Sequence, residues 1–93
     1  MSDEVKQSSD QLASSVGACI VSHRERAGLE GATLARAAGM APAYLWRVEH
    51  GRSLPSLRNL ARLAKALDVS LSALLAQADI SSVVLDNRPY ERG

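Results

Sequence analysis

Residues 31–51 read GATLARAAGMAPAYLWRVEHG, and this stretch decides the fold. Leu34 and Ala35 share one face of a short helix, and Gly39 just beyond it suits the left-handed backbone that ends a helix. Pro42 fits the first position of a second helix, because its missing N–H would have no partner there. The stretch therefore predicts two short helices joined by a tight glycine turn.

The spacing within this stretch is that of two helices that cross each other. The first helix is expected over residues 31–38 and the second over residues 42–51. Ala35 supplies the small residue that a close crossing needs, while Leu45 and Val48 supply two apolar anchors for a core. The second helix should therefore keep one face buried and leave the other face open.

Apolar residues three and four positions apart predict three more helices around this pair. Their expected limits are Ser8, Ser9 or Asp10 to about Gly28, then Ser56 to Leu67, and then Ser70 or Leu71 to about Gln77. The inward stripes of the first two are Leu12, Val16, Cys19, Ile20, His23 and Ala27, and Leu57, Leu60, Leu63, Ala64 and Leu67. The last helix offers Leu71, Leu74 and Leu75 for core or partner contacts. The prediction is an all-α fold of five helices.

The two ends of the chain differ from this helical middle. Residues 1–8 are mostly polar and bury too little apolar surface to repay ordering, so they are expected to form a flexible arm. Residues 9–78 form the expected domain. The tail, residues 79–93, is expected to form a short strand, because it contains four β-prone residues: Ile80, Val83, Val84 and Leu85.

Charge is distributed unevenly along the 93 residues, a length that allows one domain. Residues 24–65 carry eight Arg or Lys against three acids, and the rest of the chain carries three Arg or Lys against seven acids. A basic middle with acidic ends suits an anionic partner, although a solvated helical surface would also give this pattern.

Other classes of protein find little support in the composition. The lone Cys19 has no internal disulfide partner, and the absence of a secretion signal or a long apolar run points to the cytoplasm and away from a membrane. One Cys and two distant His residues make no metal set, so no metal or cofactor is expected. No spacing assembles an acid–base or nucleophilic pair, so an enzyme is not expected.

Five segments of the chain resemble the Xre-like helix-turn-helix family, to which phage repressors and Cro-type proteins belong. They are Ala27-Gly28-Leu29, LARAAG at 34–39, YLWRVEHGR at 44–52, PSL at 55–57 and LARLAKALDVSL at 60–71. The likeness extends from Val16 to Leu75. It implies a five-helix, sequence-specific DNA-binding transcriptional regulator, commonly a homodimer, whose third helix, about 42–50, enters the major groove of an operator.

The resemblance also assigns roles to particular residues. Arg24 and Glu49 would form an ion pair that holds the third helix to the first, since a guanidinium can bond a carboxylate in a fork. The base-contact residues would be Pro42, Ala43, Trp46 and Arg47, and the phosphate-contact residues would be Arg36, His50, Arg52, Ser53 and Arg58. Arg47 suits guanine O6 and N7, with a phosphate contact or a plain surface charge as alternatives. Trp46 suits a thymine methyl or a sugar, with a dimer or partner surface as the alternative.

Two departures from the family pattern bear on recognition. Glu30-Gly31 replaces the Thr-Gln type of pair at the start of the second helix, and Ala41-Pro42-Ala43 replaces a polar run at the start of the third. Fewer polar groups therefore face the groove, and specificity would depend on Arg47, apolar contacts and DNA shape.

A dimer contact is expected at the C-terminal side of the domain. Its residues would be Leu74, Leu75, Val83 and Val84, which exceed what one small core needs. The alternative function is a protein-interaction module, such as an antitoxin or accessory protein with weak or lost DNA binding, in which the tail or Trp46 contacts a protein partner.

Overall fold

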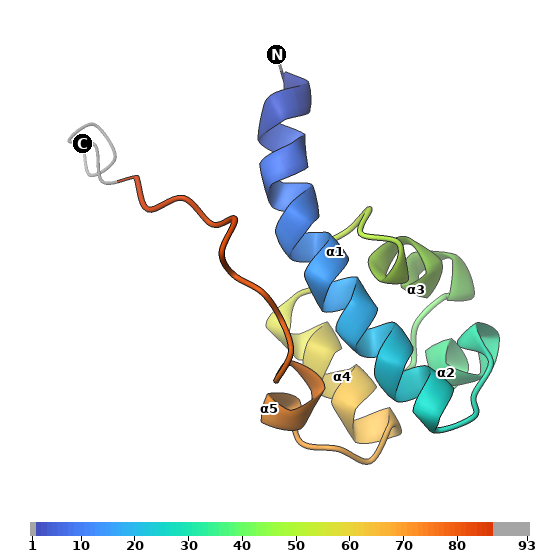
Figure 1. Ribbon diagram of the computed structural model, residues 1–93. Helices are drawn as coiled ribbons and strands as arrows, with labels where there is room; N and C mark the ends of the chain where they lie inside the picture. Colours follow the sequence, from blue (N-terminus) through green and yellow to red (C-terminus); the bar gives the residue numbers. More distant parts are fainter. Residues whose placement is uncertain (1, 87–93) are drawn as a thin grey trace.

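The computed structural model describes the backbone of residues 2–86 and the side chains of residues 11–86, and it is all-α in this range (Figure 1). Its helices are α1 (Ser2–Arg26), α2 (Gly31–Ala37), α3 (Pro42–Glu49), α4 (Leu57–Ala66) and α5 (Leu71–Leu74). The long helix α1 packs against α3 and α5, α2 packs against α3 and α4, and α4 packs against α5. The predicted five-helix architecture is confirmed.

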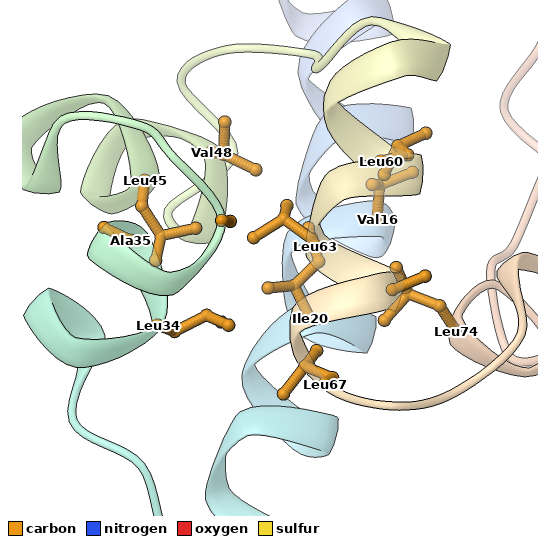
Figure 2. Packing of buried hydrophobic residues seen from close by; sticks show 12 residues of the cluster. Val16, Ile20, Leu34, Ala35, Leu45, Val48, Leu60, Leu63, Leu67 and Leu74 are labelled. Carbon is orange, nitrogen blue, oxygen red and sulfur yellow. The ribbon is translucent and has the colours of Figure 1, made fainter.

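A single apolar core lies where the five helices meet (Figure 2). The largest side chains that are fully buried come from all five: Ile20, Leu34, Leu45, Val48, Leu63 and Leu74. Burial of each such side chain contributes about 1.5–3 kcal/mol of transfer free energy, which makes this cluster the main source of stability. Most residues of the inward stripes read from the sequence form this core, but Ala27 and Leu57 are exposed, the latter at 68%, so their inward placement is wrong.

The helix ends follow the sequence signals. Gly39 has φ +75° beyond α2, and Pro42 opens α3 at its first turn. Ser56 Oγ accepts a hydrogen bond of 3.0 Å from the backbone N–H of Asn59, which caps α4. The chain reversals that place α2, α3 and α4 are therefore set by local chemistry.

Two expectations about the ends of the chain are wrong. The backbone is helical from Ser2, so α1 begins earlier than the expected start at residues 8–10, and its first turns are rich in good helix formers such as Glu4, Lys6 and Gln7. No strand occurs within residues 2–86, because Val83–Leu85 has no neighbouring strand to complete its hydrogen bonds. The rest of the tail, 87–93, lies outside the described residues.

The last helix is also shorter than expected, since it ends at Leu74 and gives way to turns. Ser70 Oγ caps it by accepting a 3.0 Å hydrogen bond from the N–H of Ala73. His23 of α1 reaches the same helix, with Nε2 at 3.1 Å from the carbonyl oxygen of Ala73. The first bond stabilises the start of α5, and the second joins this single-turn helix to α1.

Candidate nucleic-acid interface

Helix α3 presents two contrasting faces. Leu45 and Val48 are 1% and 0% exposed and anchor the inner face in the core. All four expected base-contact residues lie exposed on the other side: Pro42, Ala43, Trp46 and Arg47. A helix that is held by one face and open on the other can enter a groove without unfolding.

The rear of α3 rests directly on the backbone of α1 at Gly17. A Cβ at this position would lie 2.5 Å from the carbonyl oxygen of Val48 and 2.7 Å from that of Glu49. Real Cβ atoms essentially never approach backbone oxygen so closely, so only glycine permits this crossing. Gly17 was not among the residues predicted from the sequence, although a glycine in the middle of a helical stripe was an available signal.

The pairing of Arg24 with Glu49, which the resemblance implied, is present as a two-bond fork. Arg24 Nε donates to Glu49 Oε2 at 2.7 Å, and Nη2 donates to Oε1 at 3.1 Å. Arg24 Nη1 also donates to the carbonyl of Leu29 at 2.9 Å. The hydrogen bond with Glu49 raises the pKa of Arg24 above its ordinary value, although desolvation opposes the shift. The fork joins the last turn of α1 to the last residue of α3.

A second polar contact joins α3 to α4, and it was not predicted from the sequence. The hydroxyl of the half-buried Tyr44 accepts a 3.1 Å hydrogen bond from Asn59 Nδ2, and Arg62 Nη1 donates to Asn59 Oδ1 at 3.2 Å. The guanidinium carbon of Arg47 lies 5.8 Å from the centroid of the Tyr44 ring. Tyr44 therefore supports the arginine from the scaffold side.

An aromatic stack occupies the C-terminal end of α3. The rings of Trp46 and His50 have centroids 3.9 Å apart and an interplanar angle of 20°, and the guanidinium carbon of Arg52 lies 5.7 Å from the Trp46 ring centroid. His50 Nδ1 is 2.8 Å from the backbone carbonyl oxygen of Trp46. The spacing of Trp46 and His50, four residues apart, was the sequence signal for this contact.

The expected phosphate-contact residues lie on three elements around α3. Arg36 is exposed in the last turn of α2, and Arg58 is exposed in the first turn of α4. His50 and Arg52 are exposed after α3, where both contact Trp46, and Ser53 is half-buried in the following loop. The cationic side chains can thus reach a polyanion that lies across α3.

The expected dimer residues fall into two groups. Leu74 is 1% exposed and belongs to the core of the single chain, so its assignment to a dimer contact is wrong: α1 and α4 already cover it. Leu75 is half-buried and packs against the same core, whereas Val83 and Val84 are 46% and 73% exposed. Of the four, the two valines present the most open apolar surface.

The start of the tail is fastened to α1. The backbone N–H of Asp79 donates to Ser15 Oγ at 2.6 Å, and the Asp79 carboxylate accepts a 2.9 Å hydrogen bond from the backbone N–H of Ser81. This second bond is the main reason why the pKa of Asp79 falls below its ordinary value. The direction in which the tail leaves the domain is therefore set by specific contacts.

Other kinds of site find no support in the described part of the chain. Its residues contain no group of three or more His, Cys, Asp or Glu placed to hold a metal ion. Among them, too, no helix combines the length and the apolar character that crossing a membrane requires. Cys19 is buried and unpaired.

Comparison with known proteins identifies relatives that share this sequence pattern and this fold. Residues 15–77 match the model of the helix-turn-helix domain family. The ImmF control region 10 kDa protein of Bacillus phage phi105 is 37% identical over 59 residues, which make up 63% of this chain. The chain spans 66% of the length of that phage protein.

Solved structures agree with the sequence matches. The restriction-modification controller protein C.AhdI of Aeromonas hydrophila aligns with a TM-score of 0.65 and 34% identity, covering 67% of this chain and 94% of that one. The clp gene regulator ClgR of Corynebacterium glutamicum aligns with a TM-score of 0.71 and 34% identity, covering 76% of each chain. The crossed pair α2 and α3 and the braced rear of α3 agree with these matches. The chain therefore belongs to the Xre-like helix-turn-helix family of DNA-binding transcriptional regulators.

Proposed function

We propose that this protein binds a specific operator in double-stranded DNA with α3 in the major groove. The observation that carries the proposal is the contrast between the two faces of α3: Leu45 and Val48 are buried, while Trp46 and Arg47 are exposed. Contacts from Gly17 and Arg24 brace the helix from behind. A preorganised helix does not lose conformational freedom when it binds, which favours affinity.

Within the groove, Arg47 is the principal base-reading residue. Its guanidinium can donate to guanine O6 and N7 together, a contact worth about 1–3 kcal/mol of discrimination. The ring of Tyr44 beneath it supports an orientation toward the groove. Pro42 and Ala43 open the helix and add apolar contact at its start.

Phosphate contacts would set the register of the protein on the duplex. Arg36 in α2, Arg52 in the loop after α3 and Arg58 in α4 are exposed cations, and Ser53 lies in the same loop as Arg52. Contacts of this kind carry little sequence information but contribute much of the affinity. His50 differs from these residues, because its imidazole is stacked on Trp46 and bonded to the backbone of that residue.

We further propose that the protein acts as a homodimer in the cytoplasm. Two recognition helices about 34–36 Å apart would read half-sites on one side of the duplex. The exposed apolar residues of the tail support a contact between two chains, and they are Ile80, Val83, Val84 and Leu85. Exposed apolar residues that follow one another closely often mark an interaction surface.

The experiment is a selection from random duplex DNA with the full-length protein, repeated with Arg47→Ala. We expect one base pair of the selected half-site to lose its preference in the variant. The matched control is Lys65→Ala, which removes an exposed cation from α4 and should leave the selected sequence unchanged. Affinity should also fall steeply as salt rises, since bound phosphates release counterions. Failure to select any site, or a flat salt response, would reject operator binding. An unchanged selected site for Arg47→Ala would reject the base-reading role of Arg47.

A protein-interaction module is the second candidate function, and the exposed tail favours it. Deletion of residues 80–93 tests the tail without touching α3. If the tail joins two copies, the truncated protein should become monomeric by sedimentation while each monomer keeps its helical content. A truncated protein that remains a dimer would show that the tail plays no part in dimerisation and would leave a different protein as its partner.

A further inference from the structure

The stack of Trp46, His50 and Arg52 is more organised than an isolated surface tryptophan requires. Trp46 is 50% exposed, so half of the residue remains open to a ligand although one ring partner is already in place. His50 and Arg52 both contact its indole, at the distances given above. A tryptophan that was merely exposed on the surface would need neither neighbour.

Backbone contacts on both sides of Gly51, where the chain turns after α3, hold this stack in place. Because a carbonyl oxygen only accepts hydrogen bonds, His50 Nδ1 must carry the proton in its 2.8 Å bond to Trp46. Gly51 follows with φ +72°, and a Cβ there would collide with Ser14 of α1. The N–H of Arg52 then donates to the carbonyl of Arg47 at 2.8 Å, which returns Arg52 toward the helix. The orientation of the indole is thus set before any partner binds.

The position of the indole limits what it can recognise. Trp46 and Ala43 flank Arg47 on the exposed side of α3, so an apolar surface adjoins the base-reading guanidinium. In the major groove the only apolar group that a base pair offers is the thymine methyl. A rigid, uncharged ring edge next to Arg47 is suited to that group and poorly suited to a phosphate.

We propose that Trp46 reads the methyl group of one thymine in each half-site, adjacent to the base pair contacted by Arg47, and that His50 and Arg52 are positioning residues that hold the indole in place. This inference rests on the proposed operator binding and adds the identity of a second base. It also gives His50 a role different from the phosphate contact expected for its position.

The test uses deoxyuridine, which pairs like thymidine but lacks the methyl group. Once selection has yielded an operator, each thymine of a half-site is replaced in turn, and the Kd of the full-length protein is measured. We expect one replacement to weaken binding about fourfold, which corresponds to about 0.8 kcal/mol for one buried methyl group. Trp46→Ala should weaken binding to the thymine duplex and abolish the difference between the two duplexes at that position.

The positioning role has its own readout. His50→Ala should bring the thymine-to-deoxyuridine ratio close to one, whereas Arg58→Ala, which removes a cation outside the stack, should weaken binding to both duplexes equally. The single tryptophan of the chain gives a second measurement, since its acrylamide quenching should fall when the thymine duplex binds. This quenching should rise in unbound His50→Ala, because the imidazole no longer covers the ring.

The outcomes separate this inference from the proposed function. Failure to select any operator would remove the proposed function and the inference with it. A selected operator in which no thymine responds, or in which the response survives Trp46→Ala, would overturn the inference alone. An unchanged ratio in His50→Ala would reject its positioning role.

Discussion

Removal of either partner of the fork between Arg24 and Glu49 should destabilise the whole domain. Their side chains are 18% and 7% exposed, so the loss of one leaves the other as a poorly hydrated charge. Breaking a buried pair in this way costs about 3–5 kcal/mol. Arg24→Ala should fall near the low end, about 3 kcal/mol, because Glu49 as a whole residue is only partly buried.

Glu49→Ala should cost less, about 2 kcal/mol, because the stranded guanidinium is more exposed than the carboxylate and keeps its bond to the carbonyl of Leu29. In a domain of this size each kcal/mol corresponds to roughly 4–8 °C in Tm. The double variant Arg24→Ala with Glu49→Ala should lose less than the sum of the two single losses, by at least about 1 kcal/mol, because no charge is left unpaired.

The assay is urea unfolding followed by circular dichroism at one fixed protein concentration, since a dimer makes stability depend on concentration. Glu25→Ala is the matched control: it removes an exposed glutamate next to Arg24 and should change stability by less than about 0.5 kcal/mol. If Glu49→Ala unfolds at the same urea concentration as Glu25→Ala, the fork does not hold α3 to α1 and the reasoning fails.

Three further predictions concern other contacts. Gly17→Ala should destabilise the protein by about 2–3 kcal/mol and weaken DNA binding, because the added Cβ meets backbone oxygens, although alanine is the better helix former. The control is Gly31→Ala, where an added Cβ meets nothing within contact distance. Equal Tm values for the two variants would refute the contact. Ser56→Ala should cost about 1 kcal/mol in thermal unfolding through loss of the α4 cap, whereas Ser56→Asp should retain most of the stability, and a fully stable alanine variant would contradict the cap. The carboxyl of Asp79 has a lowered pKa, so its bond to the Ser81 N–H is present at pH values above the ordinary aspartate pKa and is lost as the pH falls through the lowered value. Ser81→Pro, which removes this N–H, should raise the pKa of Asp79 in an NMR titration. An unchanged pKa would assign the shift to another group.

Much of the fold could be predicted because local signals and the apolar pattern agree. Gly39, Pro42 and Ser56 each act within one turn of the chain, so their effect on a helix end does not depend on distant contacts. The stripe residues Leu45 and Val48 could be placed in the core for the same reason, since helix periodicity fixes which residues share a face.

The wrong expectations concern residues whose surroundings come from distant parts of the chain. Leu74 was expected at a dimer contact, yet α1 and α4 bury it, and nothing in the sequence of α5 alone states that both helices reach it. Val83 has a β-prone sequence, but a strand needs a neighbour, and within the described residues none is present.

The functional surface divides in the same way. The exposure of Trp46 and Arg47 follows from helix periodicity, and the fork between Arg24 and Glu49 was available from the family resemblance. The contacts that organise this surface could not be predicted, because they depend on how distant segments pack in space. They are the contact of Gly17 with the end of α3 and the hydrogen bond of the Tyr44 hydroxyl with α4. A single sequence gives residue types at such positions but not the distances between them.

The attachment of the tail to Ser15 has a practical consequence for work with this protein. Ser15 and Gly17 are two positions apart, and since successive residues of an α-helix are rotated by about 100°, the two lie on nearly opposite sides of α1. Figure 1 shows the orange-red tail leaving one flank of α1 while α3 occupies the other. A crosslink between the described parts of two tails would thus act on the side of the molecule turned away from α3 and would leave the exposed face of α3 free.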